Sequence, residues 1–199
     1  MTEHLRPDRT TGRRTTPIEN PVSGERIVIR RSAAETNGEL LLWELFLAVG
    51  GRVPSSHAHP EQEEKFTVLE GRMRFRVGRR TVTLGPDDTV TVPPGAVHSF
   101  ANAGVTTAQV LVETRPALEM ERLLVTAAEM ARETRRTARV FPSLPRPHEL
   151  FLFMRDFEHE VRAPYVPAIL VRSVVRPVAA LSRRAGLDGR YRRWRNAGC

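Results

Sequence analysis

The sequence predicts a mainly β protein, built as an antiparallel sandwich or barrel, with α-helices confined to its C-terminal part. Two observations predict this class. Short apolar segments separated by turn residues run from about residue 25 to 114 with no helical pattern between them. After Pro116 the spacing of apolar residues changes to a helical stripe. At 199 residues, one domain with extensions is the natural expectation.

The predicted strands are short and are bounded by Gly, Pro and Asn. They are expected at residues 26–31, 39–49, 65–70, 72–77, 80–84, 88–92, 97–101 and 106–114. The segment 40–49 is apolar on both faces apart from Glu44, so both of its faces should be covered. The outer face therefore needs either the C-terminal helices or a second subunit, and we expect a homodimer.

The C-terminal part is predicted to be helical. Helices are expected at residues 117–136, 148–161 and 166–185, the last one kinked or divided at Pro177. The apolar stretch 165–181 contains Arg172 and Arg176, and each would cost about 2.5–3.5 kcal/mol at a bilayer centre. A transmembrane span is therefore not expected. Packing against the barrel or a partner is the plainer interpretation, and an interfacial helix at a membrane surface is the alternative.

Composition sets the outer bounds. We expect a disordered arm over 1–17, a β-barrel over 18–115 and a helical extension with a basic tail over 116–199. The net charge is +8, and eight arginines lie between Arg172 and Arg195. Because that tail has few aromatic residues and no base-reading motif, a solvated basic terminus is favoured over nucleic-acid binding.

The cysteine content and the N-terminus bear on the cellular compartment. The only cysteine is Cys199, so no internal disulfide can form, as is usual in a reducing compartment. The first twenty residues lack the apolar core of a signal peptide. A cytoplasmic location is therefore expected.

Three histidines and a nearby carboxylate stand on separate apolar segments. His57 and His59 are two residues apart, so on an extended strand they point to the same face. His98 comes from a distant segment, as is needed to close a site around an ion. Imidazole suits Fe, Ni, Cu and Zn, and a carboxylate adds a hard oxygen donor. This set predicts a mononuclear metal site.

The spacing of these residues follows two motifs. Residues 51–71 read G-x5-H-x-H-x4-E-x6-G, and residues 93–102 read P-x-G-x2-H-x3-N. In both motifs the chain resembles the cupin superfamily, over roughly residues 18–115. The second motif departs at Asp87, where the family pattern has glycine.

The resemblance implies a double-stranded β-helix, the jelly-roll or cupin barrel. It implies that a divalent metal ion (Fe, Mn, Ni or Zn) is bound by His57, His59, Glu64 and His98. Glu63 is a rival to Glu64. By strand parity, the expected pocket around the metal is lined by Phe66, Met73, Phe75 and Phe100.

Three functions are compatible with such a site. The first is a metal-dependent oxidoreductase with dioxygenase-like chemistry, in which Glu64 doubles as the general base. The second is redox-neutral isomerase or cyclase chemistry, in which the ion polarises a carbonyl. The third is a non-catalytic module that binds a small molecule or metal. On family resemblance, dioxygenase-like chemistry is the favoured activity if the protein is an enzyme.

Overall fold

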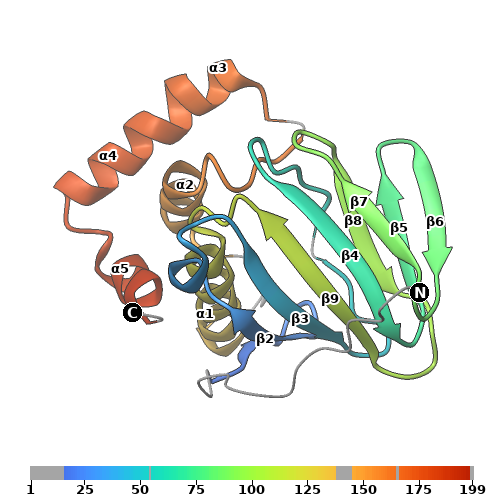
Figure 1. The fold of residues 1–199 in the computed structure, drawn as a ribbon. Coiled ribbons are helices and arrows are strands. Elements are labelled where there is room, and N and C mark those ends of the chain that lie inside the picture. The colour runs from blue at the N-terminus through green and yellow to red at the C-terminus, as the bar shows by residue number, and fades with distance from the viewer. Residues whose placement is uncertain (1–15, 54, 138–144, 165, 198–199) are drawn as a thin grey trace.

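Two antiparallel sheets face each other and form the barrel (Figure 1). The computed structural model describes residues 16–53, 55–137, 145–164 and 166–197. The larger sheet has the strand order β1-β2-β3-β9-β4-β7, and the smaller has the order β6-β5-β8. The predicted fold class, a double-stranded β-helix with C-terminal helices, is confirmed.

The strands lie close to their predicted positions. Their bounds are β1 Ile18–Asn20, β2 Glu25–Arg31, β3 Leu41–Leu47, β4 Glu63–Glu70, β5 Met73–Val77, β6 Arg80–Leu84, β7 Thr89–Val92, β8 His98–Asn102 and β9 Ala108–Arg115. A 3-10 turn, η1, covers Ala34–Thr36. All eight predicted strands are present, and β1 is an additional short strand paired with β2.

The helices depart further from the prediction. Their bounds are α1 Met120–Thr137, α2 Pro147–Asp156, α3 Ala168–Leu170, a π-helical segment η2 Val171–Val175, α4 Arg176–Arg184 and α5 Gly189–Asn196. The proposed break at Pro177 appears as the π-helical segment before it, because proline cannot supply the amide that continues an α-helix. Helix α5 was not predicted. It buries Tyr191 and Trp194, three residues apart on one helix face.

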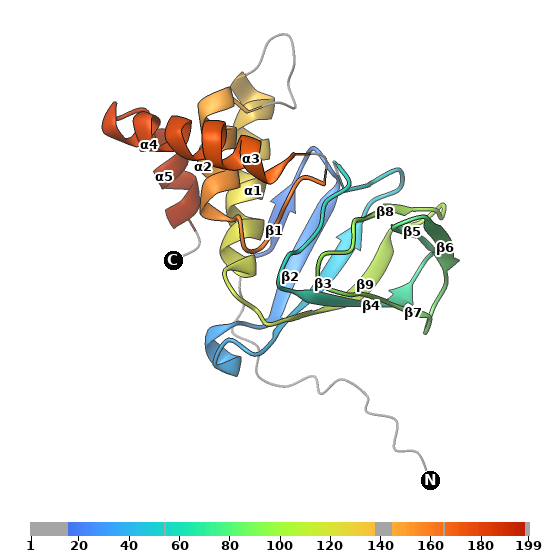
Figure 2. The ribbon, with the colours of Figure 1, turned by 90° about the horizontal axis from the view of Figure 1, so that it is seen from above.

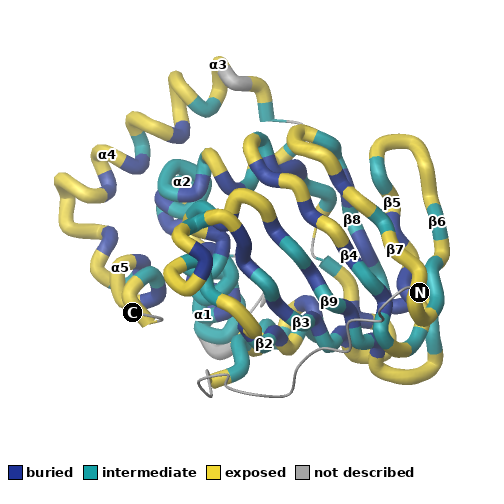
Figure 3. Tube along the Cα trace, in the orientation of Figure 1, coloured by how far each residue is buried: buried dark blue, intermediate teal, exposed yellow. Residues whose placement is uncertain are grey.

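The helices α1 and α2 lie on the same side of the larger sheet as the smaller sheet does, at the end formed by β1 and β2 (Figure 2). Ile27 and Ile29 of β2 share one buried cluster with Met120 and Leu123 of α1 and with Phe157, which follows α2. The smaller sheet covers the other end of the larger one, as Figure 2 shows. The two layers together enclose one apolar core, and the dark blue inward positions along the strands in Figure 3 mark it.

The outer face of β3 is only partly covered. Leu41, Trp43 and Leu45 point inward and are buried, whereas Leu42 and Phe46 on the opposite face are half-buried. The guanidinium carbon of Arg26 lies 5.0 Å from the centre of the Phe46 ring. Because α1 packs against the inner face of β2, this outer face is not the one that the helices cover. The homodimer stays a prediction.

The segment α3–η2–α4 carries exposed apolar residues, among them Ile169 and Leu181, beside several arginines. Within the described residues, no helix combines the length and apolar character needed to cross a membrane. Contact with a membrane surface stays a prediction. The expected disordered arm, residues 1–17, falls almost wholly outside the described residues.

Candidate metal centre

Backbone hydrogen bonds bring the two motifs together at the mouth of the barrel. The amide of His57 donates to the carbonyl of His98 at 3.0 Å, and the amide of His98 donates back at 2.8 Å. The amide of Gly95 donates to the carbonyl of His59 at 2.7 Å. The residues that carry the imidazoles are therefore held by main-chain pairing, as a rigid site requires.

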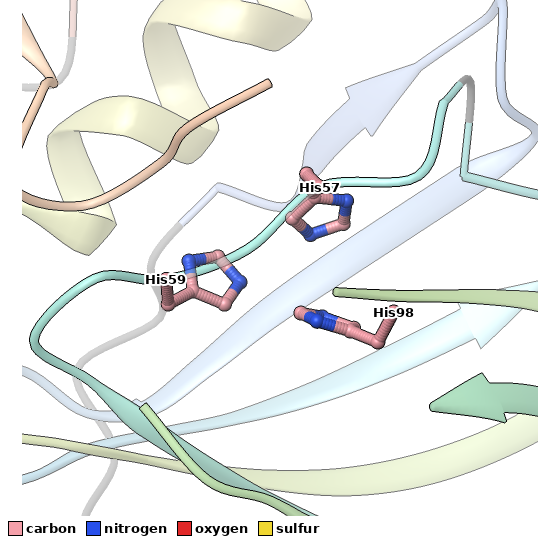
Figure 4. Close-up of side chains that lie close together, drawn as sticks. All are labelled: His57, His59 and His98. Carbon is pink, nitrogen blue, oxygen red and sulfur yellow. The ribbon is translucent and has the colours of Figure 1, made fainter. Parts of the chain in front are cut away.

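The three imidazole rings face one another (Figure 4). The ring centres are 4.9 Å apart for His57 and His59, and 4.4 Å apart for His57 and His98. One nitrogen from each of the three histidines lies within 4.8 Å of the others. This is the spacing of side chains that can share one metal ion.

Each imidazole has its Nδ1 atom committed to a backbone carbonyl. The partners are the carbonyl oxygens of Ser55 for His57 at 3.1 Å and of Ala96 for His98 at 3.1 Å. The Nδ1 atom of His59 bonds the carbonyl of Glu160. A carbonyl oxygen only accepts, so each Nδ1 must carry the proton, and a neutral ring then has a free lone pair on Nε2. Metal-ligating histidines are commonly fixed in this way.

Glu64, rather than Glu63, faces the histidines. Its Oε2 atom lies 3.1 Å from Nε2 of His59 and 3.3 Å from Nε2 of His98. Glu64 is buried, whereas Glu63 is exposed. The structure therefore brings together the four residues of the predicted ligand set, including Glu64 over its rival.

The Glu64 carboxylate is oriented from behind. The Thr114 hydroxyl donates to Oε1 of Glu64 at 3.3 Å, and Nε1 of Trp43 donates to the Thr114 oxygen at 3.1 Å. This chain of donors occupies one carboxylate oxygen and leaves the other turned toward the imidazoles. Neither Trp43 nor Thr114 was predicted at the site. Both occupy inward positions, in phase with the buried core residues of β3 and β9. Nothing local in the sequence marks them as polar supports.

Two buried imidazole nitrogens at the site lack a proton donor. Across the described residues, Nε2 of His59 and Nε2 of His98 are both buried, and while Nδ1 carries the ring proton neither can donate to Oε2 of Glu64, 3.1 and 3.3 Å away. A buried polar atom without a partner costs about 1–3 kcal/mol, so such atoms call for an explanation. Both atoms point their lone pairs toward the region that Glu64 Oε2 also faces. A cation shared among them would satisfy all three, and the residues therefore fit a metal ion.

Burial and neighbouring charges shift the pKa values of His57, His59 and Glu64. Burial, together with the neighbouring imidazoles of His98 and His59, lowers the pKa of His57 to about 3. Burial lowers the pKa of His59, but the Glu64 carboxylate outweighs this, and the net direction is upward. Burial opposes ionisation of Glu64, yet the two imidazoles hold the pKa of that carboxyl far below its usual range. The carboxylate is thus negative and suited to a cation.

A pocket of about 570 Å³ adjoins the site. His57 and Ser55 line it on the barrel side, and α2, η2 and the segment between them form the opposite wall. The apolar part of that wall consists of Leu150, Phe153, Met154, Val161, Ala163, Val166 and Val171. This wall was not predicted, because its residues lie about a hundred positions from His57 in the sequence.

The four residues expected to line the pocket lie elsewhere. Phe66, Met73 and Phe75 are completely buried in the core, and Phe100 is 7% exposed. The phenylalanine rings pack on one another, with centres 5.1 Å apart for Phe66 and Phe75. None of the four lines the pocket beside His57. They fill the barrel because strand parity places them inward, and inward positions in a narrow barrel are needed for packing.

The backbone conformation at two turns explains the residues found at motif positions 71 and 87. Gly71 has a φ of +81°, and a Cβ there would lie 2.9 Å from the Cα of Ala108, so only glycine fits. Asp87 replaces the glycine of the family pattern and adopts a φ of +69°. Aspartate tolerates this left-handed region better than most residues, so the departure leaves the turn in place.

Comparison with known proteins agrees with this geometry. Residues 43–113 match the sequence profile of the cupin domain family. No curated protein is significantly similar to the chain.

Several solved structures are similar. An RmlC-like cupin from Shewanella frigidimarina is 22% identical, with a TM-score of 0.47 over 60% of this chain and 96% of that one. A predicted oxalate decarboxylase from Thermotoga maritima is 22% identical, with a TM-score of 0.46 over 51% of this chain and 90% of that one. KdgF from Halomonas sp. is 15% identical, with a TM-score of 0.45 over 49% and 85% of the two chains. The chain therefore contains a cupin domain, matched over residues 43–113 within its jelly-roll barrel.

Proposed function

We propose that the protein binds one divalent metal ion through His57, His59, Glu64 and His98, and that it uses the ion to bind or convert a small organic molecule. One observation carries the proposal: two buried, unpaired Nε2 lone pairs face the same region as a free carboxylate oxygen. Three nitrogens and one oxygen form a mixed donor set that suits Fe, Mn, Ni or Zn.

The position of His57 supports a role for the ion in ligand binding. His57 is half-buried and lines the pocket, whereas His59 and His98 lie deeper. A four-ligand ion of this type retains open positions, and the pocket side is where a ligand would reach them. When bound, such an ion supplies a Lewis acid or, if redox-active, a route for electrons between an organic molecule and dioxygen.

Dioxygenase-like chemistry is the narrower activity that we propose. In it, the protein's residues hold the donor set rigid, and the apolar wall keeps bulk water from the reacting molecule. Glu64 was expected to double as a general base. Its lowered pKa and its hydrogen bond from Thr114 suit the ligand role better. Its catalytic role stays a prediction.

One observation favours the redox-neutral alternative. His159 lines the same pocket, and its Nδ1 atom lies 2.7 Å from Oε1 of Glu61. The Glu61 carboxylate raises the pKa of His159, which makes it a candidate proton donor for isomerase or cyclase chemistry. Replacement by glutamine, His159→Gln, would remove that proton and leave a side chain of similar size.

Metal analysis of the purified protein, followed by oxygen-uptake assays with aromatic diols and diketones, tests these proposals. A stoichiometric metal ion and substrate-dependent oxygen uptake would support the dioxygenase. Turnover without oxygen uptake, lost in His159→Gln, would support the redox-neutral enzyme. A metal ion with ligand-dependent melting shifts but no turnover would indicate the non-catalytic module. Absence of any bound metal after incubation with Fe, Mn, Ni and Zn would refute the metal proposal itself.

A further inference from the structure

We propose that the pocket between the barrel mouth and the helical extension binds an organic anion with a large apolar body. This inference deepens the proposed function, since the pocket shares His57 with the metal centre, but it rests on the pocket's own walls. The volume of about 570 Å³ lies within the range of small-molecule sites. The barrel supplies one side of the pocket, and the helical extension supplies the other.

The apolar body is inferred from the wall that the helices present. Phe153 and Met154 of α2, Val171 of η2, and Val161 and Val166 of the connecting segment all line the pocket. An aliphatic or aromatic group seated there would gain about 25 cal/mol for each Å² of apolar surface removed from water. A small polar molecule would leave most of this wall without a contact.

The negative charge is inferred from the arginines that line the pocket. Arg176 is already held by Glu158, with Nη2 of the arginine 2.9 Å from Oε1 of the glutamate. Arg162 and Arg172 also line the pocket, and within the described part of the chain neither forms an ion pair. Among the described residues that line the pocket, Glu158 is the only acidic one, so this lining carries an excess of positive charge. Guanidinium groups recognise carboxylates and sulfonates through paired hydrogen bonds.

Arg162 is placed relative to the metal centre by the main chain. Its amide donates to the carbonyl of Ala58 at 2.8 Å, and the amide of Ala58 donates back to the carbonyl of Arg162 at 3.0 Å. Ala58 lies between the two metal ligands His57 and His59. The segment carrying Arg162 is thus tied to the strand that carries the imidazoles, and a ligand held by Arg162 would lie beside the metal centre.

Binding of matched ten-carbon probes tests the proposal. Decanoate, 1-decanol and decyltrimethylammonium share an apolar chain and differ in charge, and each is titrated calorimetrically below its micelle concentration. Acetate serves as an anion without an apolar body. Every titration is done on protein stripped of metal by a chelator and again on zinc-loaded protein, so that coordination to the ion is separated from binding by the pocket.

The expected result is one decanoate per chain, bound in both forms at least tenfold more tightly than 1-decanol, acetate or the cation. Arg162→Met and Arg172→Met should each weaken decanoate binding about tenfold and leave 1-decanol binding unchanged. Arg184→Met, at an exposed arginine outside the pocket, should change neither. Ala163→Phe, at an exposed lining residue, should block all the probes without disturbing the core.

Equal affinity for decanoate and 1-decanol, binding that persists in Ala163→Phe, or decanoate binding only in the zinc-loaded form would overturn the proposal. The outcome is independent of the metal assay. Protein that takes up metal but not decanoate would refute only this inference, and protein that binds decanoate but no metal would refute only the proposed function.

Discussion

Two buried glutamates, Glu64 in the barrel and Glu149 in the helical extension, differ in how their charge is neutralised. Both oxygens of Glu149 are paired with Arg190, at 2.6 Å each, and one also accepts the amide of Arg146 at 3.1 Å. Glu64 has one oxygen satisfied by Thr114, and the other lies 3.1 and 3.3 Å from imidazole nitrogens that can donate to it only when a ring takes up a second proton. The pair around Glu149 is complete, whereas the group around Glu64 lacks one positive charge.

The comparison separates a structural ion pair from a binding site. Both carboxylates are almost fully buried, at 4% and 0% exposure for Glu64 and Glu149, so burial alone does not distinguish them. What distinguishes Glu64 is that Oε2 and the Nε2 atoms of His59 and His98 offer more lone pairs than there are protons or cations to share them. Around Glu149, Glu133 also accepts from Nε1 of Trp194 at 2.6 Å, so that cluster ties α5 to α1 and α2. Around Glu64, the excess is what a metal ion would remove.

Loss of two imidazoles should have the largest effect on the metal centre. The double variant His57→Ala/His59→Ala removes two of the four donors, so we expect purified protein without bound metal. Elemental analysis by mass spectrometry measures this directly. His148→Ala, at a histidine of α2 outside the site, is the control and should retain the metal. Full metal occupancy in the double variant would show that the ligands are elsewhere.

The same substitution at the two glutamates should give opposite results. In metal-free protein, Glu149→Gln leaves Arg190 with only its longer pairing to Glu133, at 3.4 Å, and should cost about 3 kcal/mol of unfolding free energy. Glu64→Gln should cost much less in that state, because the new amide can donate to Nε2 of a neutral imidazole. Urea unfolding of both variants and the wild type measures the difference. With metal present, only Glu64→Gln should lose affinity. Equal destabilisation by both would contradict the comparison.

The support behind Glu64 should have a smaller effect. Thr114→Val keeps the shape of the side chain but removes the hydroxyl that holds Oε1 of Glu64. Loss of such a support typically weakens metal binding about ten- to hundredfold. Competition with a chromogenic chelator gives the dissociation constant. Thr126→Val, at a buried threonine of α1, is the matched control. An unchanged affinity in Thr114→Val would mean that the strand backbone alone orients Glu64.

The two glutamates also differ in how much of their surroundings could be predicted from the sequence. The four residues of the candidate site were predicted because they lie in two local motifs that resemble the cupin pattern. The support from the Glu160 carbonyl to His59 spans 101 residues, and no local pattern encodes such a contact. The pocket wall was missed for the same reason. Arginines such as Arg190, interpreted as part of a solvated basic tail, instead pair with acids of α1 and α2.

The smallest predicted effect concerns acid stability of the metal-free protein. The folded chain holds the pKa of His57 at about 3, against an ordinary value of 6.5. Between those values the unfolded chain takes up a proton that the folded chain refuses, so stability should fall as the pH is lowered from 6.5. The raised pKa of His59 acts in the opposite sense and above pH 6.5, where its contribution is lost as the pH rises.

Melting temperatures of chelator-treated protein between pH 6.5 and 4.5 test this, since most carboxylates titrate below that window. His57→Asn should melt with a shallower dependence on pH, because asparagine has no proton to gain. Glu149→Gln should keep the wild-type dependence at a lower melting temperature. If His57→Asn and the wild type have the same slope, the imidazole is not held neutral by burial and its neighbours.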